Sequence, residues 1–139
     1  MLTPHTLELE LEFVEVRLEL ARRYAVMNGL NSVAVRGPHD WLGIAASGQT
    51  YHETLEALRL LGLRTHDDLR AAGVRLFKIG MPVPLDAAQV REFAEGLHEV
   101  VVVEEKAQNL EWLVKDALYG RADAPVVVGK RLQIGRAHV

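Results

Sequence analysis

The sequence predicts an α/β domain whose sheet is mostly parallel and covered by helices on both faces. Apolar segments of strand length alternate along the chain with longer segments in which apolar residues recur at helical spacing. The strand-like segments are apolar throughout, which is typical of parallel strands buried on both faces. The chain has 139 residues, the usual size of one domain. We therefore expect a single fold around one sheet.

The segment before the sheet, residues 1–30, is predicted to be a linker and a helix. Acidic and aliphatic residues alternate after Thr6, and apolar residues then recur at helical spacing. We expect a helix from about Leu11 to Met27, with a C-terminal cap at Asn28-Gly29. The residues ahead of Leu11 fit either a helix or an extended segment.

The first strands are expected between residues 32 and 48. The short β-branched segment Ser32–Arg36 and a turn at 37–40 precede an apolar strand, Leu42–Ala46. This strand ends in the pair Ser47-Gly48, after which the pattern becomes helical.

Two helices are predicted before the next strand. Thr50 and Glu53 have the spacing of a capping box, and the helix that they open ends at Gly62. Its expected buried face consists of Leu55, Leu58 and Leu61. Residues 64–73 are expected to form another short helix.

The second half of the chain repeats the strand–helix order. The expected strands are Leu76–Ile79, Val100–Val103 and Pro125–Val128. Asp86 can cap the helix after the first of them, and residues 109–119 are expected to form the helix after the second. The expected buried positions of these helices are Val90, Phe93, Ala94, Leu97, Leu110, Leu113, Val114 and Leu118.

The composition excludes several kinds of site. The chain has no cysteine, so it cannot hold an iron–sulfur cluster or a thiolate zinc site, or use a cysteine nucleophile. Its net charge of −3 argues against nucleic acid as a partner. No apolar run approaches the roughly 20 residues needed to span a membrane, and the acidic N-terminus does not resemble a secretory signal. A cytoplasmic location is therefore expected.

The Ser47-Gly48 turn admits three interpretations. A glycine at this place makes a tight turn between strand and helix, which is a purely structural role. The helix N-terminus can also bind an anion or a nucleotide, although the sequence lacks a P-loop lysine and a G-x-G-x-x-G spacing. A hydrolase that uses Ser47 with His39 and Asp40 requires these three side chains to converge.

A second group of candidate residues lies at the expected C-terminal edge of the sheet, where open α/β sheets bind ligands and partners. Glu104, Glu105 and Lys106 follow the valine strand, and the loop that begins with Met81-Pro82 follows the strand before it. A carboxylate here can serve acid–base chemistry, hold a neighbouring loop or subunit, or lie in a solvated turn. No nucleophile, base and orienting group occur together, so we predict a binding edge without a complete catalytic site.

Several blocks of the chain resemble one enzyme family. The segments Ala72–Leu85, Phe93–Leu97, Val101–Lys106 and Val126–Lys130 resemble the central region of indolepyruvate:ferredoxin oxidoreductases and related 2-oxoacid:ferredoxin oxidoreductases. The resemblance extends over roughly residues 11–131. Two positions depart from the family pattern: Gln49 stands where a basic residue is common, and Leu85 stands where an aromatic residue is common.

The resemblance implies a three-layer α/β/α domain like the C-terminal domain of transketolase, with about five strands, at residues 31–131. It implies a parent enzyme with thiamine diphosphate, magnesium and iron–sulfur clusters that oxidatively decarboxylates arylpyruvates to acyl-CoA and reduces ferredoxin. In such a parent this domain is non-catalytic and contacts other domains or subunits. The expected contact residues are Ser47, Gly48, Met81, Pro82, Glu104, Glu105 and Lys106.

The last residues suggest a different origin. Residues 134–139 resemble the translation of a common sequencing adapter. We therefore expect residues 132–139 to be a non-native tail and the chain to be a fragment of a longer protein from a metagenomic assembly.

Overall fold

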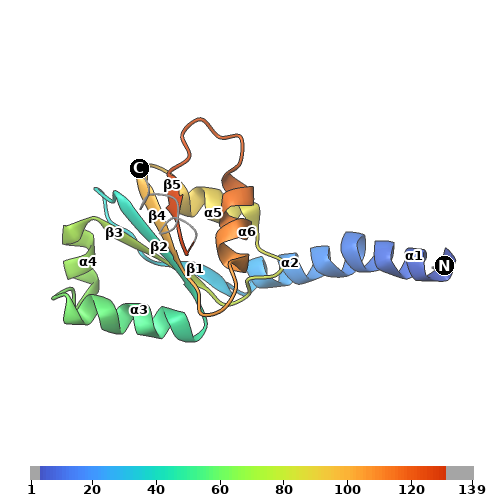
Figure 1. Ribbon diagram of the computed structural model, residues 1–139, viewed down its shortest axis with the longest axis horizontal. Coiled ribbons are helices and arrows are strands. Elements are labelled where there is room, and N and C mark those ends of the chain that lie inside the picture. The colour runs from blue at the N-terminus through green and yellow to red at the C-terminus, as the bar shows by residue number, and fades with distance from the viewer. Residues whose placement is uncertain (1–3, 131–139) are drawn as a thin grey trace.

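The computed structural model describes residues 4–130 and contains one five-stranded sheet (Figure 1). The strand order is β1-β3-β2-β4-β5, and only β1 is antiparallel to its neighbour. The strands are β1 Asn31–Val35, β2 Leu42–Ser47, β3 Val74–Ile79, β4 Glu99–Val103 and β5 Val126–Val128. The predicted α/β class and the mostly parallel sheet are confirmed.

Helices cover both faces of this sheet. They are α1 Pro4–Glu12, the π-helical segment η1 Phe13–Arg17, α2 Leu18–Met27, α3 Gln49–Leu60, α4 His66–Ala72, α5 Ala87–Ala94 and α6 Asn109–Leu118. The pair α3 and α4 lies on one face and the pair α5 and α6 on the other (Figure 1). Among the described residues, none of these helices has the length and apolar character that a membrane span requires.

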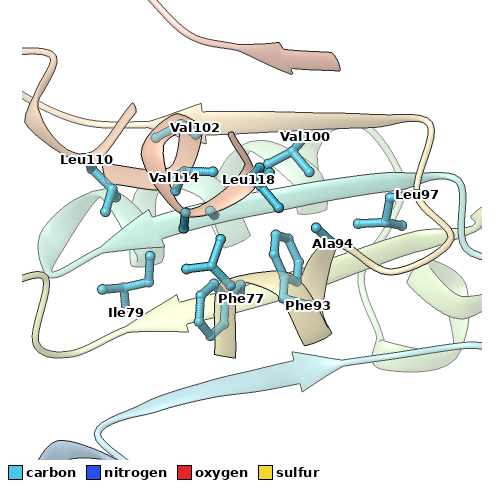
Figure 2. Packing of buried hydrophobic residues seen from close by; sticks show 13 residues of the cluster. Phe77, Ile79, Phe93, Ala94, Leu97, Val100, Val102, Leu110, Val114 and Leu118 are labelled. Atoms are coloured by element: carbon cyan, nitrogen blue, oxygen red, sulfur yellow. The ribbon is translucent and has the colours of Figure 1, made fainter. Parts of the chain in front are cut away.

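The larger of two apolar cores lies between the sheet and the α5–α6 pair. Figure 2 shows Phe77 of β3 and Phe93 of α5 side by side, and their rings stack with centroids 4.9 Å apart. Val100 and Val102 of β4 point into the same core. Of the buried positions expected in α5 and α6, only Leu113 remains partly exposed. The smaller core lies under α3 and α4 and includes Leu58, Leu69 and Leu76.

The N-terminal helix is longer than predicted. Helical structure begins at Pro4 and continues through η1 and α2 to Met27, so the residues ahead of Leu11 are helical and not extended. Glu and Leu are strong helix formers, and an extended segment here would have no strand beside it to pair with. The first part of this helix projects away from the sheet (Figure 1).

The predicted capping box at Thr50 and Glu53 is wrong. The helix begins two residues earlier, with Gly48 as the N-cap, and no side chain caps it. Thr50 is therefore inside the helix, where its hydroxyl donates to the carbonyl of Ser47 at 2.7 Å. Leu61 also lies outside the buried face, because it is 78% exposed at the C-cap.

The capping box of this region belongs to α4. The amide of Asp68 donates to the Thr65 hydroxyl at 3.1 Å, and the Asp68 carboxylate accepts from the Thr65 amide at 2.9 Å. These two hydrogen bonds satisfy N–H groups that have no partner within the helix.

The valine strand β4 supports a first prediction. Val100 is fully buried, whereas Val101 faces the other side of the sheet and is only partly buried, so β4 is not equally buried on both faces as expected. We expect Val100→Asp to lower the free energy of unfolding by more than about 3 kcal/mol, because it buries an unpaired charge. Urea denaturation measures the loss, and Val101→Asp is the matched control with a smaller loss. Equal losses would contradict this orientation of β4.

The acid sensitivity of α2 gives a second prediction. Hydrogen bonds from the guanidinium groups of Arg22 and Arg23 lower the pKa of Glu19 from 4.5 to about 2. Because this pKa is lower in the folded state, the ionised carboxylate stabilises α2 above pH 4.5, and the stabilisation is lost as the pH falls towards 2. A carboxyl NMR titration of Glu19 should have its midpoint far below that of an ordinary Glu, and Arg23→Ala should raise it. An unchanged midpoint in that variant would contradict the assignment.

Candidate functional site

The C-terminal edge of the parallel strands surrounds a hollow of about 240 Å³. The ends of β2 and β4, the loop after β3 and the first turn of α6 form its walls. Four of the predicted contact residues line it, and they are Ser47, Pro82, Glu104 and Glu105. The structure thus brings together residues that the sequence separates by more than fifty positions.

An open groove adjoins this hollow. It has a volume of about 720 Å³ and lies on the outer face of α6, where Trp112 and Tyr119 line it. Val83, Asn109 and Leu113 line both the groove and the hollow. The two form one concave surface with a polar part at the strand ends and a mostly apolar part along α6.

The Ser47-Gly48 turn forms one wall of the hollow. Gly48 has a φ of +58°, which an L side chain rarely adopts, so a glycine is needed here for the tight turn. The Thr50 hydroxyl connects this turn to β4 through the carbonyl of Val103, at 3.2 Å. The structural interpretation of Gly48 is therefore confirmed.

The loop after β3 is fastened to the edge strand β1. The buried side-chain amide of Asn31 accepts from the Met81 amide at 2.9 Å and donates to the Met81 carbonyl at 3.1 Å. Met81 itself does not line the hollow, but its fixed backbone positions Pro82 and Val83, which do. The Val83–Pro84 peptide bond in this loop is cis.

Glu104 has a structural role that the sequence left open. One oxygen of its carboxylate accepts from the Leu110 amide at 2.7 Å, and the other accepts from the Glu111 amide at 3.0 Å. Both oxygens therefore cap the N-terminus of α6, where a carboxylate also interacts favourably with the helix dipole. Glu104 holds a neighbouring helix and is neither a free acid–base group nor part of a solvated turn.

The backbone next to Glu104 is held from the end of β5. The Lys130 ammonium donates to the carbonyls of Glu105 and Lys106, at 2.8 and 2.6 Å. The Glu105 and Lys106 side chains remain exposed. Lys106 and Gly48 border the hollow without lining it.

Glu111 is a buried carboxylate that the sequence analysis missed. It is fully buried on α6, pairs with Lys115, and its Oε2 has no hydrogen-bond partner. A Cβ added at Gly129 would lie 2.3 Å from this oxygen, so a glycine is needed beside it. Helical spacing could have revealed Glu111, because it precedes the buried Val114 by three residues and Leu118 by seven.

The interpretation as a small hydrolase is wrong. Ser47 ends β2, whereas His39 and Asp40 precede its other end, so the length of the strand, about 16 Å, separates them. Asp40 also has other partners, because its carboxylate accepts hydrogen bonds from Arg75 at 2.9 Å and from the Gly37 amide at 2.8 Å. The three side chains do not converge.

The hollow is poorly suited to an anion. The Lys and Arg residues of the described chain do not line it, whereas Glu104 and Glu105 do. The N–H groups at the start of α3 favour an anion, but the two carboxylates in the same hollow repel a phosphate. Among residues 4–130 no cluster of three or more acidic or histidine side chains could hold a metal ion.

Comparison with known proteins places this domain in a family. The sequence model of a protein family, the indolepyruvate ferredoxin oxidoreductase middle domain, matches residues 31–138 of this chain. The chain belongs to this family. The predicted resemblance is thereby confirmed for the middle domain. The match includes the segments that form the sheet edge and the hollow.

Individual relatives agree with this assignment. Subunit IorA of indolepyruvate oxidoreductase from Methanothermobacter marburgensis is 36% identical over 100 residues, which are 72% of this chain and 15% of that protein. The subunit from Pyrococcus abyssi is 31% identical over 99 residues, 70% of this chain and 14% of that protein. This middle-domain chain therefore spans about a seventh of the relatives that it matches.

A solved structure supports the fold. A 2-oxoglutarate:ferredoxin oxidoreductase from Magnetococcus marinus has a TM-score of 0.52 and 18% sequence identity to this chain. The likeness covers 93% of this chain and 21% of that one. In each of these comparisons the chain matches only part of a longer oxidoreductase chain.

The cap of α6 gives a third prediction. Glu104→Ala should lower the free energy of unfolding by about 1 kcal/mol, because two amides at the start of α6 lose their acceptor. The matched control is Glu105→Ala, whose exposed side chain should contribute less than about 0.5 kcal/mol. Equal urea midpoints for the two variants would show that the cap is unimportant.

Proposed function

We propose that this chain is a non-catalytic interaction domain of a thiamine-diphosphate-dependent 2-oxoacid:ferredoxin oxidoreductase. The proposed parent is of the indolepyruvate type, decarboxylates arylpyruvates to acyl-CoA and passes the electrons to ferredoxin in the cytoplasm. The match of the middle-domain family model over residues 31–138 carries this proposal. We take residues 31–131 as the domain and residues 1–30 as its linker and helix. The proposed non-native tail, residues 132–139, lies outside the described residues and stays a prediction.

The residues of this chain do not fit the cofactors of such a parent. Iron–sulfur clusters need cysteine thiolates, and the sequence has none. Magnesium is bound through carboxylates, but both oxygens of Glu104 already accept hydrogen bonds from α6. We therefore assign thiamine diphosphate, magnesium and the clusters to other parts of the parent and place no step of the reaction on this domain.

The hollow and the groove are the surface by which we expect the domain to contact its neighbours. The walls are fixed: Glu104 caps α6, Asn31 fastens the loop after β3, and Thr50 connects the α3 turn to β4. Rigid walls favour a contact surface, because little side-chain or loop freedom is lost on binding. The exposed aromatic residues Trp112 and Tyr119 are of the types that are enriched at interfaces.

A domain exchange tests this proposal. Residues 31–131 replace the matched segment of the Methanothermobacter marburgensis IorA subunit, and the chimera is assayed with indolepyruvate, coenzyme A and ferredoxin. We expect the chimera to assemble and to reduce ferredoxin, and the isolated chain to be inactive. Decarboxylation by the isolated chain, or a folded chimera that fails to assemble, would contradict the proposal.

Two variants of the chimera locate the contact surface. Tyr119→Ala removes an exposed side chain of the groove and should weaken assembly, whereas Leu60→Ala removes an exposed side chain of α3 and serves as the control. Both changes should leave the stability of the isolated domain within about 0.5 kcal/mol. If the chimera assembles as well with Tyr119→Ala as with Leu60→Ala, the groove is not part of the interface.

A further inference from the structure

The buried carboxylate of Glu111 is unfavourable for the fold. Its side chain is fully buried, and within residues 4–130 its Oε2 accepts no hydrogen bond. Burial removes the water that would otherwise solvate both oxygens, and a single charged partner replaces this water only in part. The carboxylate also restricts the end of β5, because a side chain in place of Gly129 would collide with it. An uncharged residue would pack here more favourably, so the presence of Glu111 needs a reason outside the core.

The partner of this carboxylate connects it to the groove on α6. Lys115, one turn further along the helix, donates from its ammonium to Oε1 of Glu111. The Lys115 side chain is 39% exposed and lines the groove. The ion pair therefore extends from a fully buried group to the surface that we propose as the contact with neighbouring domains. A lysine ammonium has three N–H donors, and Glu111 accepts from one of them, so donors remain for a group that enters the groove.

The ion pair determines where the Lys115 ammonium lies. A lysine side chain has a flexible four-carbon stem, and on an exposed helix its ammonium would extend into water. The hydrogen bond to a buried carboxylate instead keeps the ammonium close to the helix. Trp112 precedes Lys115 by three residues and Tyr119 follows it by four, so both lie next to it on the surface of α6. The ammonium is thereby fixed on the face that carries the two exposed aromatic side chains.

The charges of the groove select the group that Lys115 can bind. Glu111 and Lys115 together have no net charge, and Asp116 adds a carboxylate to the lining. A carboxylate or a phosphate would therefore meet a repulsion that the paired lysine does not offset. A neutral carbonyl oxygen accepts a hydrogen bond from the ammonium without this repulsion. The rest of the lining is mostly apolar, so the occupant that fits is a peptide segment that combines apolar side chains with an unpaired backbone carbonyl.

We propose that Glu111 is a positioning residue that holds the Lys115 ammonium for a backbone carbonyl of a neighbouring domain or subunit, whose apolar side chains cover Trp112 and Tyr119. The inference rests on the proposed function, because the neighbour is another part of the parent oxidoreductase. A donor that is fixed before binding loses little side-chain freedom in the complex. The carboxylate that fixes it lowers the stability of the isolated domain, which is a common relation between a binding group and the fold that carries it.

Glu111→Gln separates this role from a structural one. In the chimera with the Methanothermobacter marburgensis IorA subunit, the variant should weaken assembly about tenfold, because the released lysine no longer offers a fixed donor. In the isolated 139-residue chain, the same change should leave the urea midpoint unchanged or raise it, since it removes a buried charge. Glu56→Gln is the matched control, because it breaks an exposed ion pair with Arg59 on α3 and should change both measurements little.

The outcomes for the chimera distinguish this inference from the proposed function. If the chimera with Glu111→Gln assembles as well as the unmodified chimera, the inference is overturned and the proposed function stands. A clear fall in the urea midpoint of the isolated variant would also overturn the inference, because Glu111 would then serve the fold. If the unmodified chimera folds but does not assemble, the proposed function fails and this inference fails with it.

The reactivity of the lysines tests the positioning in the isolated chain. With limiting acetic anhydride, Lys115 should be acetylated more slowly than the exposed Lys106, because the hydrogen bond to Glu111 engages its ammonium. Glu111→Gln should raise the rate at Lys115 several-fold and leave the rate at Lys106 unchanged. Mass spectrometry of tryptic peptides measures both rates. Equal rates at Lys115 in the two chains would show that Glu111 does not hold the ammonium and would overturn the inference.

Discussion

The close approach of α5 to the sheet is the constraint on which the rest of the domain depends. It occurs at Gly43 of β2, where an added Cβ would lie 2.6 Å from Leu97 and 2.7 Å from the ring of Phe93. Only a strand without a side chain at this position lets Phe93 reach the stack with Phe77. The larger core, and with it the position of α6 beside α5, follows from this contact. The position of α6 in turn determines part of the shape of the hollow, because α6 forms one of its walls.

Polar interactions fix the positions of helix ends that the apolar core does not determine. The core places α6 against β4, but it does not determine where the helix begins. The Glu104 carboxylate does so by accepting both amides at the first turn. On the opposite edge of the sheet, Arg75 joins Asp40 to the carbonyls of Phe93 and Glu95 and so holds the end of α5. At each end of the parallel strands, one charged side chain thus holds a helix end through several hydrogen bonds: the half-buried Glu104 at one end and the buried Arg75 at the other.

The sequence predicted the fold well because its signals are local. Strands such as Val100–Val103 and the apolar spacing in α5 are recognised from a few consecutive residues. The errors concern features that depend on the third dimension. Thr50 and Glu53 have the right spacing for a capping box, but the tight turn at Gly48 starts the helix earlier. The orientation of Val101 depends on which side chains of β4 meet the larger core, and an all-valine strand carries no alternation that reveals it.

The candidate site was predicted only as a location. Parallel strands place their C-terminal ends together, so the sequence could assign Ser47, Pro82 and Glu104 to one edge. It could not assign the role of Glu104, because the accepting amides lie six and seven residues away and their position requires the folded helix. The buried Glu111 escaped notice because an acidic residue on a helix is expected to face water.

The antiparallel direction of β1 has a mechanical consequence. Because β1 runs against β3, its first residue, Asn31, lies beside Ile79 at the C-terminal edge of the sheet. The chain therefore enters the sheet at the same edge as the hollow, and α2 ends within four residues of Asn31. The paired hydrogen bonds from Asn31 to Met81 connect this entry point to the loop that walls the hollow. The end of α2 and the loop that walls the hollow are therefore mechanically joined through Asn31 and the three residues before it.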